Sequence, residues 1–342
     1  MRTVAKVVVF LWGLSAWAQP PDDWRARRVI VIGVDGLSVD GVNKAHIPRL
    51  KRLMERAAWT LEARAVLPTL SSPNWESIIT GAGTEQHGIT SNGYLRKLVE
   101  FQPACLDAQG MFPTIFGLLR AARPSARIAV FHDWGGFANL LEKNAPDVLK
   151  HESGPEKTTA AAIQYWKGNL PALLFIHLDN VDHTGHEEGW SSPAYLRAVE
   201  DADKHIGEIL DMVNEASAED STFIMITSDH GGKGRNHGGN SMEEMLVPWV
   251  FSGPDVAPGQ INGPVYAYDT AATLAWIYGF SLADCAIGRP VLAAFRPAAV
   301  ALRIAGQPGT GERGCQPLQP RVPAGSPVLV APYEVGIGHS KD

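Results

Sequence analysis

Residues 28–36 read RVIVIGVDG. A continuous apolar run of this kind that ends at glycine is typical of a strand buried on both faces, as in the middle of a parallel sheet. The sequence therefore predicts a central strand that ends close to Asp35. These glycines lack the Gly-x-Gly-x-x-Gly spacing of a dinucleotide-binding turn, so we set that interpretation aside.

Similar short apolar runs recur along the chain, and helical patterns precede them. They lie at residues 126–131, 172–178, 222–227 and 247–251. The clearest helical pattern covers about 192–215, where apolar residues recur at helical spacing behind a Ser-Pro start. Alternating strands and helices indicate a three-layer α/β sandwich with a mostly parallel central sheet.

The two ends of the chain differ in composition from the middle. Residues 1–18 combine basic residues, an apolar stretch and the ending Ala-Trp-Ala, which is typical of a signal peptide cleaved near Ala18. The apolar stretch is shorter than the ~20 residues of a spanning helix. We therefore expect an exported protein, periplasmic or secreted, without a stable membrane anchor. Residues 19–295 would form one catalytic domain and 296–342 a Pro/Gly-rich extension, in which an apolar run at 327–332 suggests an edge hairpin.

Charge and cysteine content limit the classes of partner. The formal net charge is −6 and long runs of Lys or Arg are absent, so a nucleic-acid scaffold is not an expected partner. The three cysteines, Cys105, Cys285 and Cys315, do not have the spacing of a thiolate metal site. One disulfide would be compatible with export, but we expect unpaired thiols.

Polar residues that could bind metal follow three of the predicted strands. Asp35 follows the first, Asp182 and His186 follow the strand at 172–178, and Asp229 and His230 follow the strand at 222–227. In open α/β sheets, sites form at the carboxyl ends of the strands. These side chains should therefore meet at one edge of the sheet.

With His237, from a glycine-rich segment further on, these residues can be sorted into two sets of three ligands. One set is Asp35, Asp229 and His230, and the other is Asp182, His186 and His237. Oxygen and nitrogen donors without thiolate suit zinc, manganese or iron, and zinc is the first expectation.

The residues alone leave alternatives open. Asp179 and His183 have the same spacing as Asp182 and His186, and His177 is close by in the sequence as well. Asp229 could instead cap a helix. A histidine in a glycine-rich loop, such as His237, is often an ordinary loop residue that binds no metal.

Two further segments carry a recognisable pattern. Residues 68–81 read PTLSSPNWESIITG and residues 87–92 read HGITSN. They resemble the nucleotide pyrophosphatase/phosphodiesterase branch of the alkaline phosphatase superfamily, in which a nucleophilic Thr or Ser stands two residues before Pro-Asn and opens a helix that ends in Thr-Gly. The resemblance covers roughly residues 28–290, and the metal-ligand motifs follow in the family's order.

The resemblance implies an alkaline-phosphatase-like fold and a two-metal hydrolase of phosphate esters. Ser71 would attack phosphorus beside a metal held by Asp35, Asp229 and His230, and form a phosphoseryl intermediate. The family's Gly before its His selects Asp182 and His186, with His237, as the second set. A serine hydroxyl needs such help, because it is a weak nucleophile near neutral pH.

Asn92 is the expected oxyanion-binding residue. The amides at the start of the helix that Ser71 opens favour an anion, so a backbone N–H near Ser72 and the Asn92 side chain would bind a non-bridging phosphoryl oxygen. The alternative for Asn92 is an ordinary turn residue beside Gly93.

Departures from the family pattern bear on the substrate, which we expect to be a small-molecule phosphate ester. Nucleotide-cleaving members usually carry an aromatic directly after the nucleophile, where this chain has Ser72. Four other aromatic residues could flank a nucleobase instead: Trp75, Trp134, Tyr94 and Trp190.

A phosphodiesterase or nucleotide pyrophosphatase is therefore the first prediction, and other classes stay open. Lys233 and Arg235 lie near the ligands in sequence and could serve a phosphomonoesterase. A phosphonate or sulfate ester hydrolase is a further alternative, although Trp75 stands where the sulfatase maturation signal has Arg. A non-catalytic protein that binds metal or phosphate belongs to another class. The oligomeric state stays open.

Overall fold

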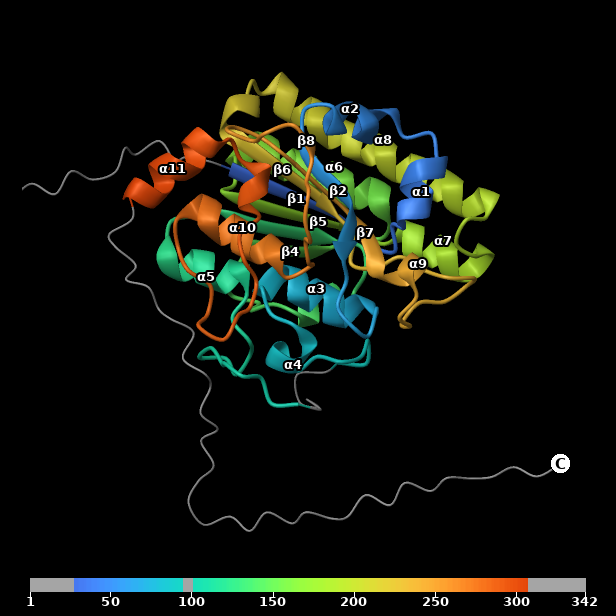
Figure 1. The fold of residues 1–342 in the computed structure, drawn as a ribbon, viewed down its shortest axis with the longest axis horizontal. Coiled ribbons are helices and arrows are strands. Elements are labelled where there is room, and N and C mark those ends of the chain that lie inside the picture. Colours follow the sequence, from blue (N-terminus) through green and yellow to red (C-terminus); the bar gives the residue numbers. More distant parts are fainter. Residues whose placement is uncertain (1–27, 95–100, 307–342) are drawn as a thin grey trace, which may run out of the picture.

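The predicted central strand, β1 (Arg28–Val34), lies inside an eight-stranded sheet (Figure 1). The structure is a computed structural model, and it describes residues 28–94 and 101–306. The strand order is β4-β3-β5-β1-β6-β7-β2-β8. The strands are β1 (Arg28–Val34), β2 (Ala58–Arg64), β3 (Ile128–His132), β4 (Val148–His151), β5 (Leu173–Leu178), β6 (Thr222–Thr227), β7 (Leu246–Ser252) and β8 (Gly259–Gln260). The start of the chain, including the expected signal peptide, and the run at 327–332 lie outside the described residues.

The sheet is mostly parallel, as predicted. β1 pairs in parallel with both β5 and β6, whereas β7 runs antiparallel to β6 and to β2. The carboxyl ends of β1, β5 and β6 therefore lie side by side at one edge. Five of the strands coincide closely with the predicted apolar runs.

Helices cover both faces of the sheet (Figure 1). They are α1 (Val39–Lys44), α2 (Pro48–Met54), α3 (Ser71–Thr80), α4 (Thr84–His87), α5 (Ile115–Ala122), α6 (Pro155–Asn169), α7 (Asn180–Glu188), α8 (Pro193–Glu215), α9 (Met242–Met245), α10 (Asp269–Tyr278) and α11 (Pro297–Gly306), with short 3-10 turns at Phe137–Asn139, Glu219–Ser221 and Leu292–Ala294. The predicted helix at 192–215 is α8.

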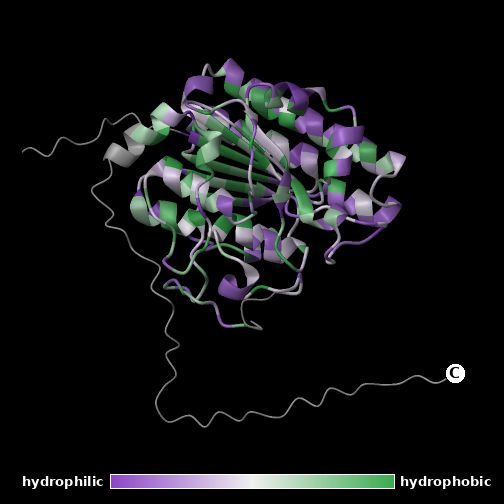
Figure 2. Cartoon of the chain, in the orientation of Figure 1, coloured by the Kyte–Doolittle hydropathy of each residue, from purple (hydrophilic) through white to green (hydrophobic). Residues whose placement is uncertain are grey.

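The alternation of side chains along β1 supplies two cores. Val29 and Val31 pack toward the layer of α3, α5 and α10, while Ile30 and Ile32 pack toward the layer that contains α8. Figure 2 shows hydrophobic residues along the strands and hydrophilic residues on the outer side of α8. Burial on both faces explains why β1 reads as an unbroken apolar run.

The expectation of unpaired cysteines is wrong for two of the three. Cys105 and Cys285 form a disulfide across 180 residues of sequence. Such a separation gives no local sequence signal, because only the folded chain brings the two residues together. Cys315 lies outside the described residues.

The described part of the expected C-terminal extension begins with a helix. α11 starts at Pro297, one residue after the expected boundary, and Ala299 on its first turn is buried. None of the helices in the described ranges has the length and apolarity needed to cross a membrane.

A close contact between β1 and α3 gives a prediction about stability. A Cβ atom at Gly33 would lie 2.4 Å from Cη2 of the buried Trp75. Gly33→Ala should lower the free energy of unfolding by about 1–3 kcal/mol through overpacking, measured by urea denaturation. Gly168→Ala is the matched control, because a Cβ there has no atom within 4 Å and helix α6 should gain slightly. Equal stabilities of the two variants would contradict the packing of Trp75 against β1.

Candidate active site

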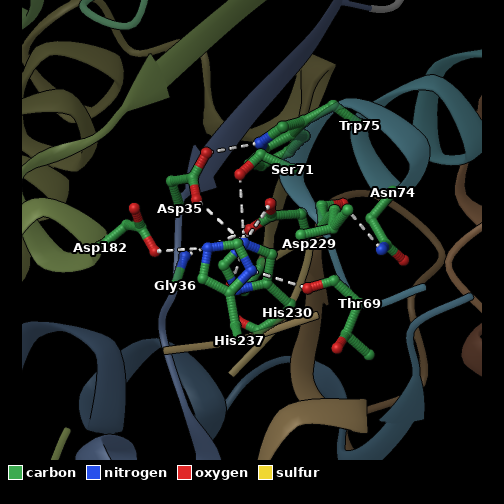
Figure 3. Close-up of polar contacts among 12 residues, drawn as sticks. Asp35, Gly36, Thr69, Ser71, Asn74, Trp75, Asp182, Asp229, His230 and His237 are labelled. Atoms are coloured by element: carbon green, nitrogen blue, oxygen red, sulfur yellow. Dashed lines mark hydrogen bonds and ion pairs between the residues drawn. The ribbon is translucent and has the colours of Figure 1, made fainter. Parts of the chain in front are cut away.

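The ends of neighbouring strands bring the predicted ligands together. Asp35 directly follows β1, and Asp229 and His230 lie just beyond the end of β6. Asp182 and His186 lie on α7, which begins two residues after β5. His237 comes from the loop between β6 and α9. Figure 3 shows the side chains of Asp35, Asp182, Asp229, His230 and His237 converging from different elements.

The first predicted set surrounds the position in front of Ser71. The ligand atoms of Asp35, Asp229 and His230 all lie within 4.8 Å of one another. His230 Nε2 is 3.1 Å from Asp229 Oδ2 and 3.5 Å from Asp35 Oδ1. Ser71 Oγ is 3.2 Å from the same nitrogen (Figure 3). The hydroxyl is therefore adjacent to this set.

The second predicted set lies beside the first. Asp182, His186 and His237 also offer ligand atoms within 4.8 Å of one another. His186 Nε2 is 3.5 Å from Asp182 Oδ2, and His237 Nε2 is 3.7 Å from Asp182 Oδ1. The rings of His230 and His237 stack with centroids 3.7 Å apart, so the two sets share a boundary.

All three histidines are held by the ring nitrogen that faces away from the site. The acceptors are backbone carbonyl oxygens, of Gly231 for His230 (2.8 Å), of Arg235 for His186 (2.9 Å) and of Thr69 for His237 (2.7 Å). A carbonyl only accepts, so each Nδ1 must donate its proton and each Nε2 keeps a lone pair toward the site. The Nε2 atoms of His186 and His237 are 3.0 Å apart, a pairing of lone pairs that a shared cation would stabilise.

The carboxylates of the two sets also need a positively charged partner. Asp35 Oδ1, Asp182 Oδ1 and Asp229 Oδ2 are buried and have no hydrogen-bond partner among the described residues. A buried, unpaired carboxylate oxygen is costly unless it is compensated. Each of these oxygens belongs to one of the two sets, so the donors present fit divalent cations.

Crowding of negative charge shifts the pKa values of these carboxyl groups. Burial, followed by the charges of Asp35 and Asp179, raises the pKa of Asp182 to about 9. Burial and the charges of Asp35 and Asp182 likewise raise the pKa of Asp229 well above its usual value. A cation between these groups would favour their charged forms and remove the repulsion.

Asp35 is held differently from the other two. Its Oδ2 accepts hydrogen bonds from Trp75 Nε1 at 2.7 Å and from His177 Nε2 at 3.1 Å. Burial raises the pKa of Asp35, but the hydrogen bond and the positive charge of His177, together with the hydrogen bond from Trp75, outweigh it and lower the pKa to about 2. Asp35 therefore stays ionised.

Trp75 does not serve as an aromatic surface for a substrate. Its side chain is fully buried, and its indole binds Asp35. Trp190 is also buried and donates to Gly36 O at 3.0 Å. Of the four aromatic residues expected as nucleobase neighbours, Trp134 and Tyr94 alone are half-exposed.

The first turn of α3 is arranged differently from the expectation. Asn92 Oδ1 accepts the Ser72 N–H at 2.9 Å, so that amide is already used. Pro73 has no N–H, and the N–H of Ser71, the first residue of the helix, has no acceptor within that helix. Asn92 lies beside the first turn of α3, and its Nδ2 is its remaining donor group.

Asn74 explains the Pro-Asn part of the nucleophile motif. Its Oδ1 accepts the N–H of Val66 at 2.6 Å. Its Nδ2 donates to the carbonyls of Leu70 (2.9 Å) and Pro68 (3.1 Å). One side chain thus fixes the loop that presents Ser71.

The structure also separates the alternatives for α7. His183 is exposed and pairs with Glu187, 3.2 Å away, so it does not join either set. Asp179 lies within 4.8 Å of the ligand atoms of Asp35 and Asp182. His177, which the sequence shows close to this motif, lies on β5 and outside both sets. Our sequence reasoning missed Asp133, directly after β3, although its position at a strand end was an available signal.

Comparison with known proteins gives the family and the fold. The family model for type I phosphodiesterase/nucleotide pyrophosphatase matches residues 29–247. An uncharacterized pyrophosphatase/phosphodiesterase of Schizosaccharomyces pombe is 26% identical over 230 residues, which are 59% of this chain and 44% of that protein. Rat ectonucleotide pyrophosphatase/phosphodiesterase family member 1 is 23% identical over 231 residues, 62% of this chain and 25% of that protein. The chain thus spans less than half the length of these two relatives.

Solved structures show the same fold at low identity. Murine ectonucleotide pyrophosphatase/phosphodiesterase 5 has a TM-score of 0.63 at 16% identity and covers 75% of this chain and 96% of its own. Alkaline phosphatase PafA has a TM-score of 0.67 at 11% identity, with 78% and 98% covered. The predicted alkaline-phosphatase-like α/β fold is therefore confirmed. Because the family model matches more than half of the residues of this chain, the chain belongs to the type I phosphodiesterase/nucleotide pyrophosphatase family.

Proposed function

We propose that the protein is an exported two-metal hydrolase that cleaves phosphodiesters through a phosphoseryl intermediate on Ser71. The observation that carries this proposal is the place of Ser71 Oγ, 3.2 Å from His230 Nε2 and beside two convergent ligand sets. Family membership supports the reaction class, since the relatives are named phosphodiesterases and pyrophosphatases.

Each ligand set would hold one cation. Asp35, Asp229, His230 and the Ser71 hydroxyl would bind the first, and Asp182, His186 and His237 the second. When bound, two divalent cations, which we expect to be zinc with manganese or iron as alternatives, would acidify Ser71 and an attacking water and stabilise the entering and leaving oxygens.

The chain's own residues then account for the two chemical steps. Ser71 Oγ gives its proton to solvent and forms a bond to phosphorus as the bond from phosphorus to the leaving alcohol oxygen breaks, and that oxygen takes up a proton from solvent. A water oxygen next attacks the phosphoseryl group and loses one proton to solvent, and Ser71 Oγ leaves and takes up a proton. The products are an alcohol and a phosphate monoester. The Ser71 N–H and Asn92 Nδ2 would bind a non-bridging oxygen in both steps.

The positions of the basic side chains near the site favour a diester substrate over a monoester substrate. A monoester carries an additional negative charge that a basic side chain would meet. Lys233 is exposed and lies 3.7 Å from Glu243, a carboxylate with which it pairs. Arg235 contributes to the site through its backbone carbonyl, which holds His186.

The nucleophile can be tested with a matched pair of serine variants. Ser71→Ala should lower kcat/KM for bis-p-nitrophenyl phosphate by about 10³-fold or more, because the attacking oxygen is lost. Ser72→Ala keeps the backbone N–H that Asn92 accepts and should stay within about threefold of wild type. Full activity of Ser71→Ala would contradict the role of Ser71 as the nucleophile.

Substrate preference can be measured in the same assay. We expect wild-type protein to hydrolyse bis-p-nitrophenyl phosphate faster than mono-p-nitrophenyl phosphate, since the side chain of Lys233, which could meet a second charge, pairs with Glu243. A reversed preference would instead indicate a phosphomonoesterase.

Metal stoichiometry can be tested on α7. Wild-type protein loaded with zinc and desalted should hold two equivalents by elemental analysis. His186→Ala should hold about one, because its set loses one of three protein ligands. His183→Ala, three residues away, should hold two, since His183 is exposed and pairs with Glu187. Equal metal contents in the two variants would contradict the ligand assignment.

The export part of the proposal rests on the N-terminal pattern and is supported by the disulfide between Cys105 and Cys285. Disulfides persist mainly in oxidising compartments. Protein expressed from its full sequence should begin at Gln19 by intact mass, and its denatured, unreduced form should label at one of its three cysteines. A retained first segment or three reactive thiols would contradict export.

A further inference from the structure

We propose that Asp133 and His177 are positioning residues that fix the orientation of Asp35 and thereby raise the affinity of the first ligand set for its cation. The inference rests on the proposed two-metal function, and it assigns work to two buried residues outside both ligand sets.

Asp35 uses its two oxygens for different purposes. Oδ2 accepts hydrogen bonds from Trp75 Nε1 (2.7 Å) and His177 Nε2 (3.1 Å). Oδ1 has no hydrogen-bond partner in the described part of the chain and lies 3.5 Å from His230 Nε2. Two donors on one oxygen restrict rotation of the carboxylate group, so the other oxygen stays directed at the metal position.

His177 can hold this place because its ring is packed on several sides. It lies on β5, opposite Gly33 of β1 and His132 of β3, and is fully buried. The Trp75 ring meets it edge-on at 4.8 Å between centroids, and Phe137 lies at 5.0 Å. The imidazole therefore has little freedom to turn its Nε2 away from Asp35.

Asp133 faces the other nitrogen of the same ring. Since β3 and β5 pair in register at His132 and His177, the next residue of the chain, Asp133, lies beside the end of β5. Asp133 Oδ1 is 3.5 Å from His177 Nδ1, and both atoms are buried without another hydrogen-bond partner among the described residues. The carboxylate thus orients the ring so that Nε2 donates to Asp35.

The three residues form a line from β3 through β5 to β1, behind the first ligand set. Loss of His177 would free Asp35 Oδ2 and allow Oδ1 to turn away from the metal position. Loss of such an outer partner typically lowers metal affinity by about 10- to 100-fold. The effect should fall mainly on one of the two cations, because His177 donates its hydrogen bond to Asp35, a member of the first set.

The test compares zinc affinities by competition with a chromogenic chelator, a readout that does not depend on hydrolysis. His177→Leu should weaken the binding of one of two zinc ions by about 10- to 100-fold. His177→Gln, whose amide can still donate to Asp35, should restore most of the affinity. Asp133→Asn should lie between wild type and His177→Leu.

His205 supplies a matched control for the loss of a buried histidine. It is buried on α8 between two carboxylates, 3.6 Å from Asp201 and 3.3 Å from Glu208, as His177 is between Asp133 and Asp35. His205→Leu should bind both zinc ions as wild type does, whatever its effect on the unfolding midpoint. A purely structural role for His177 would give the two leucine variants the same zinc affinity.

The outcomes separate this inference from the proposed function. If wild type binds two zinc ions and His177→Leu loses affinity for one of them, the inference stands even if no phosphodiester is hydrolysed. If wild type hydrolyses the diester but His177→Leu and Asp133→Asn bind zinc as tightly as wild type, the inference is overturned. Should His177→Leu fail to fold, the zinc affinity of Asp133→Asn decides.

Discussion

Repulsion among buried carboxylates is the constraint around which the site is built. Asp35, Asp182 and Asp229 meet at the carboxyl edge of the sheet, and each keeps one oxygen without a hydrogen-bond partner in the described part of the chain. These residues lie close together because they follow the carboxyl ends of β1, β5 and β6, which are neighbouring parallel strands. Such a cluster is costly in isolation, and positive charge placed between its members removes the cost.

Neighbouring elements hold the candidate ligand side chains of the site in fixed orientations. Three backbone carbonyls set the tautomers of the three histidines, so that each Nε2 faces the same space. Trp75 joins the core beneath α3 to Asp35, and Gly33 leaves room for its ring. Asn74 ties the loop before Ser71 to the helix that follows it. Fold and site are therefore held by some of the same contacts.

Sequence reasoning predicted those parts that leave a local pattern. The central strands read as unbroken apolar runs because both of their faces are buried, and Asp35, Asp229 and His230, which the structure brings together, directly follow two of those runs. Strands β2, β4 and β8 were missed. β2 has exposed charged positions, β4 has only four residues and β8 only two, so neither length nor pattern marks them.

Contacts between distant segments were beyond the same reasoning. The disulfide joins residues 180 positions apart, and the link from Asp133 through His177 to Asp35 crosses three strands. Trp75 looked like a surface for a substrate because its neighbours in sequence surround the nucleophile, whereas the helix turns it into the core. Asn92 lies beside the start of α3, and its bond to the Ser72 amide depends on a loop geometry that sequence does not encode locally.

The central claim is that two cations occupy the two ligand sets. A crystal of the zinc-loaded protein, measured on both sides of the zinc absorption edge, tests it most directly. The account predicts two anomalous peaks, one among Asp35, Asp229 and His230 beside Ser71 Oγ, and one among Asp182, His186 and His237. A fully loaded crystal with a single peak, or with peaks bound elsewhere, would contradict it.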